Sequence, residues 1–206
     1  MANGFLQTYF TRDVLDSQQK YFGRSQQNDA PIERDPLGAE EVEFITRRDS
    51  FYMATVNSDG WPYVQHRGGP AGFLRVLDAY TLGFADFRGN RQLVSTGNVI
   101  SNDRVALFLM DYRQRERLKI NGHVHVLDAR EHTQLADGLA PPLLRAKTER
   151  IFLIETLSFD WNCSQYITPR YTSDEMETIV AALHTRIAEL EEKVRTGSGL
   201  NDSSSA

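Results

Sequence analysis

Hydrogen-bond donors are dense in residues 86–98, between two segments that have the composition of strands. Arg88 and Arg91 bring guanidinium groups, while Gly89 and Gly97 allow backbone N–H groups to approach a ligand closely. The stretch also holds the neutral donors Asn90, Gln92, Ser95, Thr96 and Asn98, and the carboxylate Asp86. This set suits a phosphate. A helical turn beginning near Arg91 would strengthen the attraction through its free N–H groups and the positive end of its dipole. An ordinary polar loop between strands is the alternative.

A glycine-rich break follows another predicted strand. His66 and Arg67 end that strand, and Gly68, Gly69 and Pro70 come directly after it. Arg67 is therefore expected at the rim of a sheet, beside bare backbone against which a planar ligand could lie. A Gly-Pro turn with a solvated arginine is the alternative.

Residues 161–171 form a third polar and aromatic stretch. Trp161, Gln165 and Arg170 combine a large aromatic ring, an amide and a cation in a short span. That mixture is typical of a segment that faces a ligand, although a strand end with a rim arginine has the same composition.

Metal and nucleophile chemistry have weaker support. His123 and His125 alternate on a predicted strand and so share a face, but a metal site needs three or four ligands and no third stands at a suitable spacing. We therefore predict no metal site. Cys163 has no neighbouring base or cation and is interpreted as a structural thiol.

Length and composition limit the class of protein. The 206 residues are 40% hydrophobic, which is enough for a folded core, and the formal net charge of −5 argues against a general nucleic-acid binder. No apolar run is long enough to span a bilayer, the N-terminus does not resemble a signal peptide, and one cysteine cannot form an internal disulfide. We expect a cytoplasmic protein that binds neither membrane nor nucleic acid.

The spacing of apolar residues predicts a small antiparallel barrel with helices around it. Helices are predicted over residues 12–22, 40–46, 131–140 and 174–195. Strands are predicted over residues 51–56, 61–67, 73–77, 80–85, 104–110, 117–127 and 150–159. The helix at 174–195 has an apolar stripe and a capping box at Thr172 and Glu175, so it is expected to pack in the core or against a second subunit. The predicted organisation is an N-terminal helix and linker (1–35), the barrel (36–172), a C-terminal helix (173–196) and a disordered tail (197–206).

Taken together, the three stretches resemble the pyridoxamine 5′-phosphate oxidase-like superfamily of FMN-binding split barrels. The segments that carry the resemblance are residues 49–56, 60–70, 84–92, 102–108 and 161–171. The resemblance covers residues 40–171. It implies a mainly β fold, an antiparallel split barrel of about six strands with Greek-key connections, peripheral helices and a C-terminal amphipathic helix.

The resemblance also implies a homodimer with FMN at the subunit interface. Arg67 and Arg91 resemble the basic residues that hold the phosphate, and Gly68 to Pro70 resemble the backbone beside the flavin ring. Trp161, Gln165 and Arg170 resemble a C-terminal segment that reaches a flavin across the interface. Further cofactor-binding residues implied in this way are Asp86, Asn90, Gln92, Ser95 and Asn98.

The expected function is that of an FMN-dependent oxidoreductase that uses a small-molecule substrate or electron donor. The Gly-Gly-Pro loop, residues 93–100 and the C-terminal segment depart from the biosynthetic oxidase, so we expect a related protein and assign no substrate. His66 is the only candidate named for proton handling. The alternatives are a non-catalytic flavin- or haem-binding module, which His123 and His125 would favour, and a deazaflavin-dependent reductase.

Overall fold

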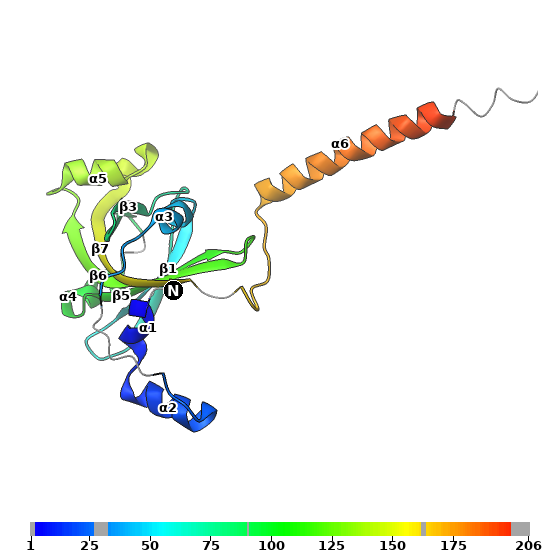
Figure 1. Ribbon diagram of the computed structural model, residues 1–206. Helices are drawn as coiled ribbons and strands as arrows, with labels where there is room; N and C mark the ends of the chain where they lie inside the picture. Colours follow the sequence, from blue (N-terminus) through cyan, green and yellow to red (C-terminus); the bar gives the residue numbers. More distant parts are fainter. Residues whose placement is uncertain (1–2, 27–32, 90, 162–163, 199–206) are drawn as a thin grey trace, which may run out of the picture. The chain divides into compact units, whose positions relative to one another are not determined.

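The computed structural model describes residues 3–26, 33–89, 91–161 and 164–198 of the chain. The chain forms two compact units. The first spans Met1–Asp111 and Arg115–Tyr166, and the second spans Tyr112–Gln114 and Ile167–Ala206. The first unit contains the sheet, and the second contains the C-terminal helix (Figure 1).

A seven-stranded antiparallel sheet makes up most of the first unit. Its strand order is β2-β1-β5-β6-β7-β4-β3. The strands are β1 (Ser50–Val56), β2 (Pro62–Gly68), β3 (Arg75–Asp78), β4 (Thr81–Phe87), β5 (Arg104–Asp111), β6 (Glu116–Asp128) and β7 (Thr148–Trp161). The sheet is curled but not closed, since β2 and β3 remain as its edges, so the predicted split-barrel fold is confirmed. Each predicted strand is found within a few residues of its expected bounds.

Helices lie around the sheet and between its strands. In the first unit these are α1 (Asn3–Tyr9), α2 (Arg12–Phe22), α3 (Ala39–Thr46), α4 (Val94–Ser101), α5 (Thr133–Leu139) and the 3₁₀ helix η1 (Pro142–Lys147). The prediction of α2 is confirmed at both ends, where Thr11 caps its start and Gly23 its end. The sequence did not predict α1, and α4 replaces part of what was expected to be a loop.

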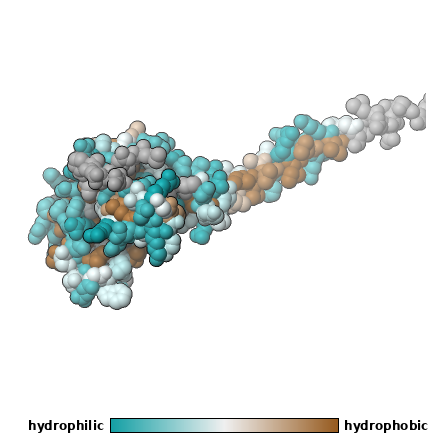
Figure 2. Space-filling model, turned by 60° about the horizontal axis from the view of Figure 1, so that its bottom comes forward, coloured by the Kyte–Doolittle hydropathy of each residue, from teal (hydrophilic) through white to brown (hydrophobic). Residues whose placement is uncertain are grey.

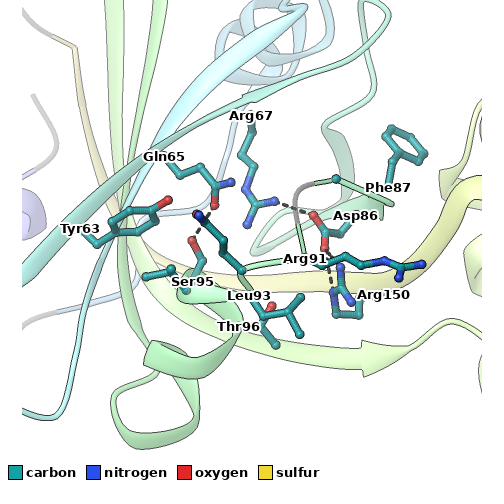
Figure 3. Close-up of a pocket in the computed structure, with 13 residues that line it drawn as sticks. Tyr63, Gln65, Arg67, Asp86, Phe87, Arg91, Leu93, Ser95, Thr96 and Arg150 are labelled. Atoms are coloured by element: carbon teal, nitrogen blue, oxygen red, sulfur yellow. Dashed lines mark hydrogen bonds and ion pairs between the residues drawn. The ribbon is translucent and has the colours of Figure 1, made fainter.

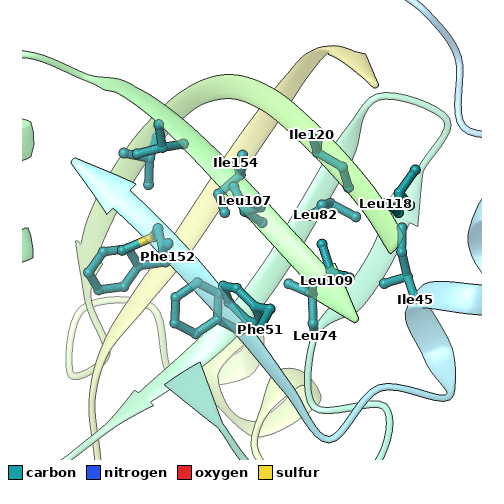
Figure 4. Packing of buried hydrophobic residues seen from close by; sticks show 14 of the residues in the cluster. Ile45, Phe51, Leu74, Leu82, Leu107, Leu109, Leu118, Ile120, Phe152 and Ile154 are labelled. Carbon is teal, nitrogen blue, oxygen red and sulfur yellow. The ribbon is translucent and has the colours of Figure 1, made fainter. Parts of the chain in front are cut away.

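The barrel interior is filled by large apolar side chains from strands that are not neighbours in the sheet (Figure 4). The ring of Phe51 on β1 lies edge-on to Phe84 on β4, with 5.4 Å between centroids, although three strands separate β1 from β4 in the sheet order. Phe84 in turn stacks on Phe152 of β7 at 4.9 Å. These contacts show that the sheet curls until its two edges approach each other. They bring the functional residues of β2 and β4 to the same place.

Gly122 stands at a β-bulge, where the pairing of β6 with β7 shifts register. A Cβ atom on Gly122 would lie 2.4 Å from the carbonyl oxygen of Glu155, so no larger residue fits without moving backbone. We expect Gly122→Ala to lower the free energy of unfolding by about 1–3 kcal/mol, measured by urea denaturation. Gly97→Ala in α4 is the matched control, because nothing lies within 4 Å of its Cβ position and alanine favours a helix by up to about 1 kcal/mol. Equal losses in the two variants would contradict this explanation.

The N-terminal helix α1 docks on the outside of the barrel. Phe5 is buried, and the hydroxyl of Tyr9 donates to Oδ1 of Asn121 on β6 at 2.7 Å. Tyr9 thereby satisfies a buried amide oxygen, which would otherwise destabilise the sheet. Helix α1 is thus part of the folded unit.

The second unit is dominated by α6 (Ser173–Ser198). The predicted capping box is confirmed, because the N–H of Thr172 donates to Glu175 at 2.9 Å and the N–H of Glu175 donates to the Thr172 hydroxyl at 3.3 Å. The backbone hydrogen bond from Thr172 lowers the pKa of Glu175. The apolar stripe along α6 is exposed in the single chain (Figure 2). The predicted tail beyond Ser198 lies outside the described residues. None of the helices described here has both the length and the apolar character that crossing a bilayer requires.

Candidate functional site

A polar pocket of about 200 Å³ opens beside the ends of β2 and β4 (Figure 3). Its walls come from β2, the end of β4, the segment that leads into α4, and the start of β7. The lining residues are Tyr63, Gln65, Arg67, Asp86, Phe87, Gly89, Arg91, Gln92, Leu93, Val94, Ser95, Thr96 and Arg150. The donor-rich stretch singled out from sequence therefore forms one wall of a pocket.

Strand β2 supplies the second wall through the alternation of its side chains. Tyr63, Gln65 and Arg67 are two residues apart and point to the same face, where they are half-buried, while the residues between them are exposed. Gln65 also accepts a hydrogen bond from the Ser95 hydroxyl at 2.9 Å, which ties β2 to the start of α4. The two walls are thus held together by a side-chain contact inside the pocket.

A bridging carboxylate organises the arginines at the base of the pocket. Oδ1 of Asp86 accepts from Nη1 of Arg67 at 2.5 Å, and Oδ2 accepts from Nε of Arg150 at 2.8 Å. Asp86 and Arg150 are directly opposite in the antiparallel pairing of β4 with β7, whereas Arg67 reaches across the gap in the barrel from β2. Asp86 therefore fixes two guanidinium groups from strands that are not neighbours in the sheet, the edge strand β2 and the interior strand β7.

Arg67 is held in a mostly apolar environment. Its guanidinium lies 5.0 Å from the ring centroid of Phe152 and 5.6 Å from that of Phe84, within cation–π range. Burial lowers the pKa of Arg67, and the charge of Asp86 partly offsets that shift. The Nε–H of Arg67 is buried and has no hydrogen-bond partner among the described residues. An unused donor on a buried cation is what an added acceptor, such as a phosphate oxygen, would satisfy.

The segment before α4 has an unusual backbone conformation. Arg91 and Leu93 have φ values of 60° and 55°, in the left-handed region that non-glycine residues rarely adopt. Leu93 precedes the first residue of α4 and provides no side-chain cap, so the first N–H groups of α4 are left for other acceptors. Because Val94, Ser95 and Thr96 line the pocket, the positive end of α4 faces it.

The charge balance of the pocket favours an anion. Three arginines and one carboxylate give its lining a net formal charge of +2. The carboxylate is engaged by two guanidiniums, whereas Arg91 forms no ion pair with any of the described residues. An anion entering this pocket would meet a free guanidinium and the N-terminus of a helix, which together resemble the phosphate sites of many proteins.

Two predicted groups of site residues lie outside the pocket lining. Gly68 ends β2 and is followed by Gly69 and Pro70, and a Cβ on Gly69 would lie 2.7 Å from the ring of Phe73. The need for glycine at position 69 is therefore explained by packing against Phe73. Asn98 is buried under the pocket and donates from Nδ2 to the hydroxyl of Thr55 at 2.9 Å, which anchors α4 to β1.

The C-terminal candidates each have different surroundings. Trp161 donates from its indole N–H to Glu41 at 2.7 Å and packs edge-on against Phe44. Gln165 is an exposed turn residue. Arg170 belongs to the second unit, where its guanidinium lies 4.8 Å from the ring centroid of Tyr112. Asn90, a further predicted cofactor ligand, lies outside the described residues.

The histidine candidates are also placed away from this pocket lining. His66 is on the face of β2 opposite to Arg67 and lies edge-on to Tyr52, with 5.6 Å between ring centroids. His123 and His125 are each beside a carboxylate, Asp103 at 3.1 Å and Glu155 at 3.6 Å. Within the described part of the chain, no three metal-ligating side chains gather at one place.

Sequence reasoning missed three residues that line the pocket. Tyr63 and Gln65 carried a usable signal, since they precede Arg67 at intervals of two in a predicted strand. Nothing in the sequence indicated Arg150, because its position beside Asp86 depends on the register of β4 with β7. The structure therefore adds one guanidinium and two neutral polar groups to the predicted set.

The fold and pocket define a split-barrel protein with a positively charged pocket at the gap between its sheet edges. The family model described as pyridoxamine 5′-phosphate oxidase matches residues 37–141, just over half of the chain, and the chain belongs to that family. The match includes the pocket residues from Tyr63 to Thr96 but ends before Arg150. No curated protein matches the chain.

Several solved structures are similar to this chain at low sequence identity. One is a protein of Clostridium acetobutylicum that is related to general stress protein 26 and belongs to the pyridoxinephosphate oxidase family. It is 13% identical to this chain, the match covers 66% of this chain and 94% of that protein, and the TM-score is 0.47. An F420 reductase is 21% identical, with coverages of 61% and 98% and a TM-score of 0.42. An FMN-binding protein from Syntrophomonas wolfei is 10% identical, with coverages of 60% and 87% and a TM-score of 0.42. None of these similarities says what this chain binds.

Proposed function

We propose that the pocket binds the 5′-phosphate of FMN and that the chain is an FMN-dependent oxidoreductase. The observation that carries this proposal is the meeting of Arg67, Arg91 and Arg150 at the uncapped N-terminus of α4. The chain's membership of the pyridoxamine 5′-phosphate oxidase family supports a cofactor that carries a phosphate. The residues present fit such a group, since they offer a net positive lining and an unused donor on Arg67.

Each part of the pocket has a distinct proposed role. Arg91 would make the direct ion pair with the phosphate, because no described carboxylate competes for it. The N–H groups at the start of α4 would donate to phosphate oxygens, as would the Ser95 hydroxyl after leaving Gln65. Arg67 and Arg150, which are held by Asp86, would supply positive potential from the base of the pocket.

The size of the pocket supports a homodimer. Pockets for small molecules and cofactors usually measure about 300–1,000 Å³, whereas this one measures about 200 Å³. The pocket of one chain therefore has room for the phosphate end of FMN, and the rest of the molecule would extend beyond it. We propose that a second subunit completes the site around the flavin ring, with Gly68 to Pro70 beside the ring and Trp161, Gln165 and Arg170 reaching from the partner.

Bound FMN would supply hydride or single-electron transfer, and the protein would supply binding and orientation. Asp86 is an unsuitable proton acceptor in such a reaction, because both of its oxygens are engaged by guanidinium groups. His66 faces away from the pocket in the single chain, so a role for it would require a site built on the other face of β2. The substrate class proposed is a small molecule or electron donor that the site holds beside the flavin ring.

The absorption spectrum of the purified protein, before and after adding FMN, tests this proposal. We expect flavin bands that shift on binding, with fluorescence quenched as the ring enters the site. A Soret band after exposure to haem, or selective binding of a deazaflavin, would instead support one of the two alternative functions. A colourless protein that leaves the spectrum of added FMN unchanged would contradict the proposal.

A further inference from the structure

The exposed stripe of α6 follows a seven-residue repeat. Its apolar side chains recur at alternating intervals of four and three residues, the spacing of positions a and d in a coiled coil. The members are Met176, Val180, Leu183, Ile187, Leu190 and Val194. Each is between 40% and 68% exposed in the single chain. An exposed apolar stripe with this heptad spacing is typical of a helix that packs against another helix.

The residue types at the two positions differ in a way that selects the number of helices. If Val180 is assigned to position a, the a positions are Val180, Ile187 and Val194, which are all β-branched. The d positions are then Met176, Leu183 and Leu190. β-Branched residues at a with leucine at d favour a two-stranded, parallel coiled coil. Among parallel coiled coils, the pattern therefore indicates one partner helix.

The charges beside the stripe select the same arrangement. Arg186 and Lys193 occupy g positions, and Glu177 and Glu191 occupy e positions. In a parallel pair, each g residue faces the e residue five positions later in the other helix. Arg186 of each helix therefore faces Glu191 of the partner subunit, which gives two such pairs in the dimer. In an antiparallel pair, g residues face g residues and e residues face e residues, which would oppose like charges.

We propose that α6 forms a parallel, two-stranded coiled coil with α6 of a second copy of this chain. Arg186 pairs with Glu189 of its own helix at 2.8 Å, but that pair is exposed and can exchange for the interhelical one at little cost. The coiled coil does not depend on the proposed function, so either proposal can fail alone.

Disulfide trapping in the full-length chain tests the proposal. Cys163 is first replaced by serine, because it is the only cysteine of the sequence. Val194→Cys then places a thiol at an a position, where two parallel helices bring equivalent Cα atoms to about 6 Å, within disulfide range. In an antiparallel pair centred on the stripe, the same two Cα atoms would be about 27 Å apart. Glu192→Cys, two residues earlier on the outer face, is the matched control.

Under mild oxidation we expect Val194→Cys to give mostly cross-linked dimer and Glu192→Cys at least tenfold less. Arg186→Glu is expected to lower the yield from Val194→Cys severalfold, and adding Glu191→Arg is expected to restore it. These two residues are five positions apart and do not face each other on one helix, so their coupling reports contact between chains. Equal yields at positions 194 and 192, no cross-link at 194, or a double charge variant no better than the single one would each overturn the proposal.

Discussion

Replacing Arg91 with alanine is expected to raise the dissociation constant for FMN about ten- to a hundredfold. A hydrogen bond to a charged group contributes about 1.5–3 kcal/mol, which corresponds to that range. Arg91 is the exposed guanidinium of the pocket and has no ion-pair partner among the described residues, so its loss removes attraction without disturbing an internal pair. Quenching of flavin fluorescence during titration measures the change.

Arg88→Ala is the matched control for this prediction. Arg88 lies three residues before Arg91, carries the same charge, and is 61% exposed, but it pairs with Glu149 at 3.5 Å and does not line the pocket. We expect FMN affinity to remain within about twofold, since the charge of Arg88 is exposed, already paired with Glu149 and screened by solvent. Equal weakening in the two variants would show that only the overall charge matters and that the phosphate position is wrong.

Replacing Asp86 with asparagine is expected to lower the free energy of unfolding by about 3–5 kcal/mol. Asp86 neutralises two guanidinium groups whose side chains are only 13% and 19% exposed, those of Arg67 and Arg150. Asparagine keeps the shape but leaves Arg67 without a counter-charge and leaves Arg150 with only Glu149, at 3.2 Å. Urea denaturation followed by circular dichroism measures the loss.

Two comparisons sharpen the Asp86 prediction. Asp128→Asn removes a carboxylate that pairs with the exposed Arg130, and its effect on stability is expected to be much smaller. Added inorganic phosphate is expected to stabilise Asp86→Asn more than the unchanged protein, because an anion can take the place of the lost carboxylate. A variant as stable as the unchanged protein, with no response to phosphate, would contradict the bridging role of Asp86.

The parts of the site that lie on one strand or one loop were predictable from the sequence. Period-two alternation placed Arg67 at the end of a strand, and the same rule would have added Tyr63 and Gln65. The donors around Arg91 were visible from composition alone. In each case the signal is local, because neighbours in the sequence become neighbours in the pocket.

The parts that depend on pairing between distant strands were not predictable. Arg150 is 64 residues from Asp86, and only the register of β4 with β7 brings them together. The sequence suggested no more than a helical turn near Arg91, because Gly97 and Asn98 have low helix propensity, whereas the structure holds α4 through buried contacts of Asn98 and Val99. The contact that requires glycine at position 69, with the ring of Phe73, likewise depends on packing in three dimensions.

Comparing FMN with riboflavin in the same calorimetric titration tests the central claim most directly. The two molecules share the flavin ring and differ in the phosphate, which the account places among Arg67, Arg91 and the N-terminus of α4. We predict that FMN binds at least about a hundredfold more tightly, which corresponds to two or more charge-assisted hydrogen bonds, and that Arg91→Ala removes a large share of the difference. Equal affinity for the two molecules, or failure of both to bind, would contradict the assignment of this pocket.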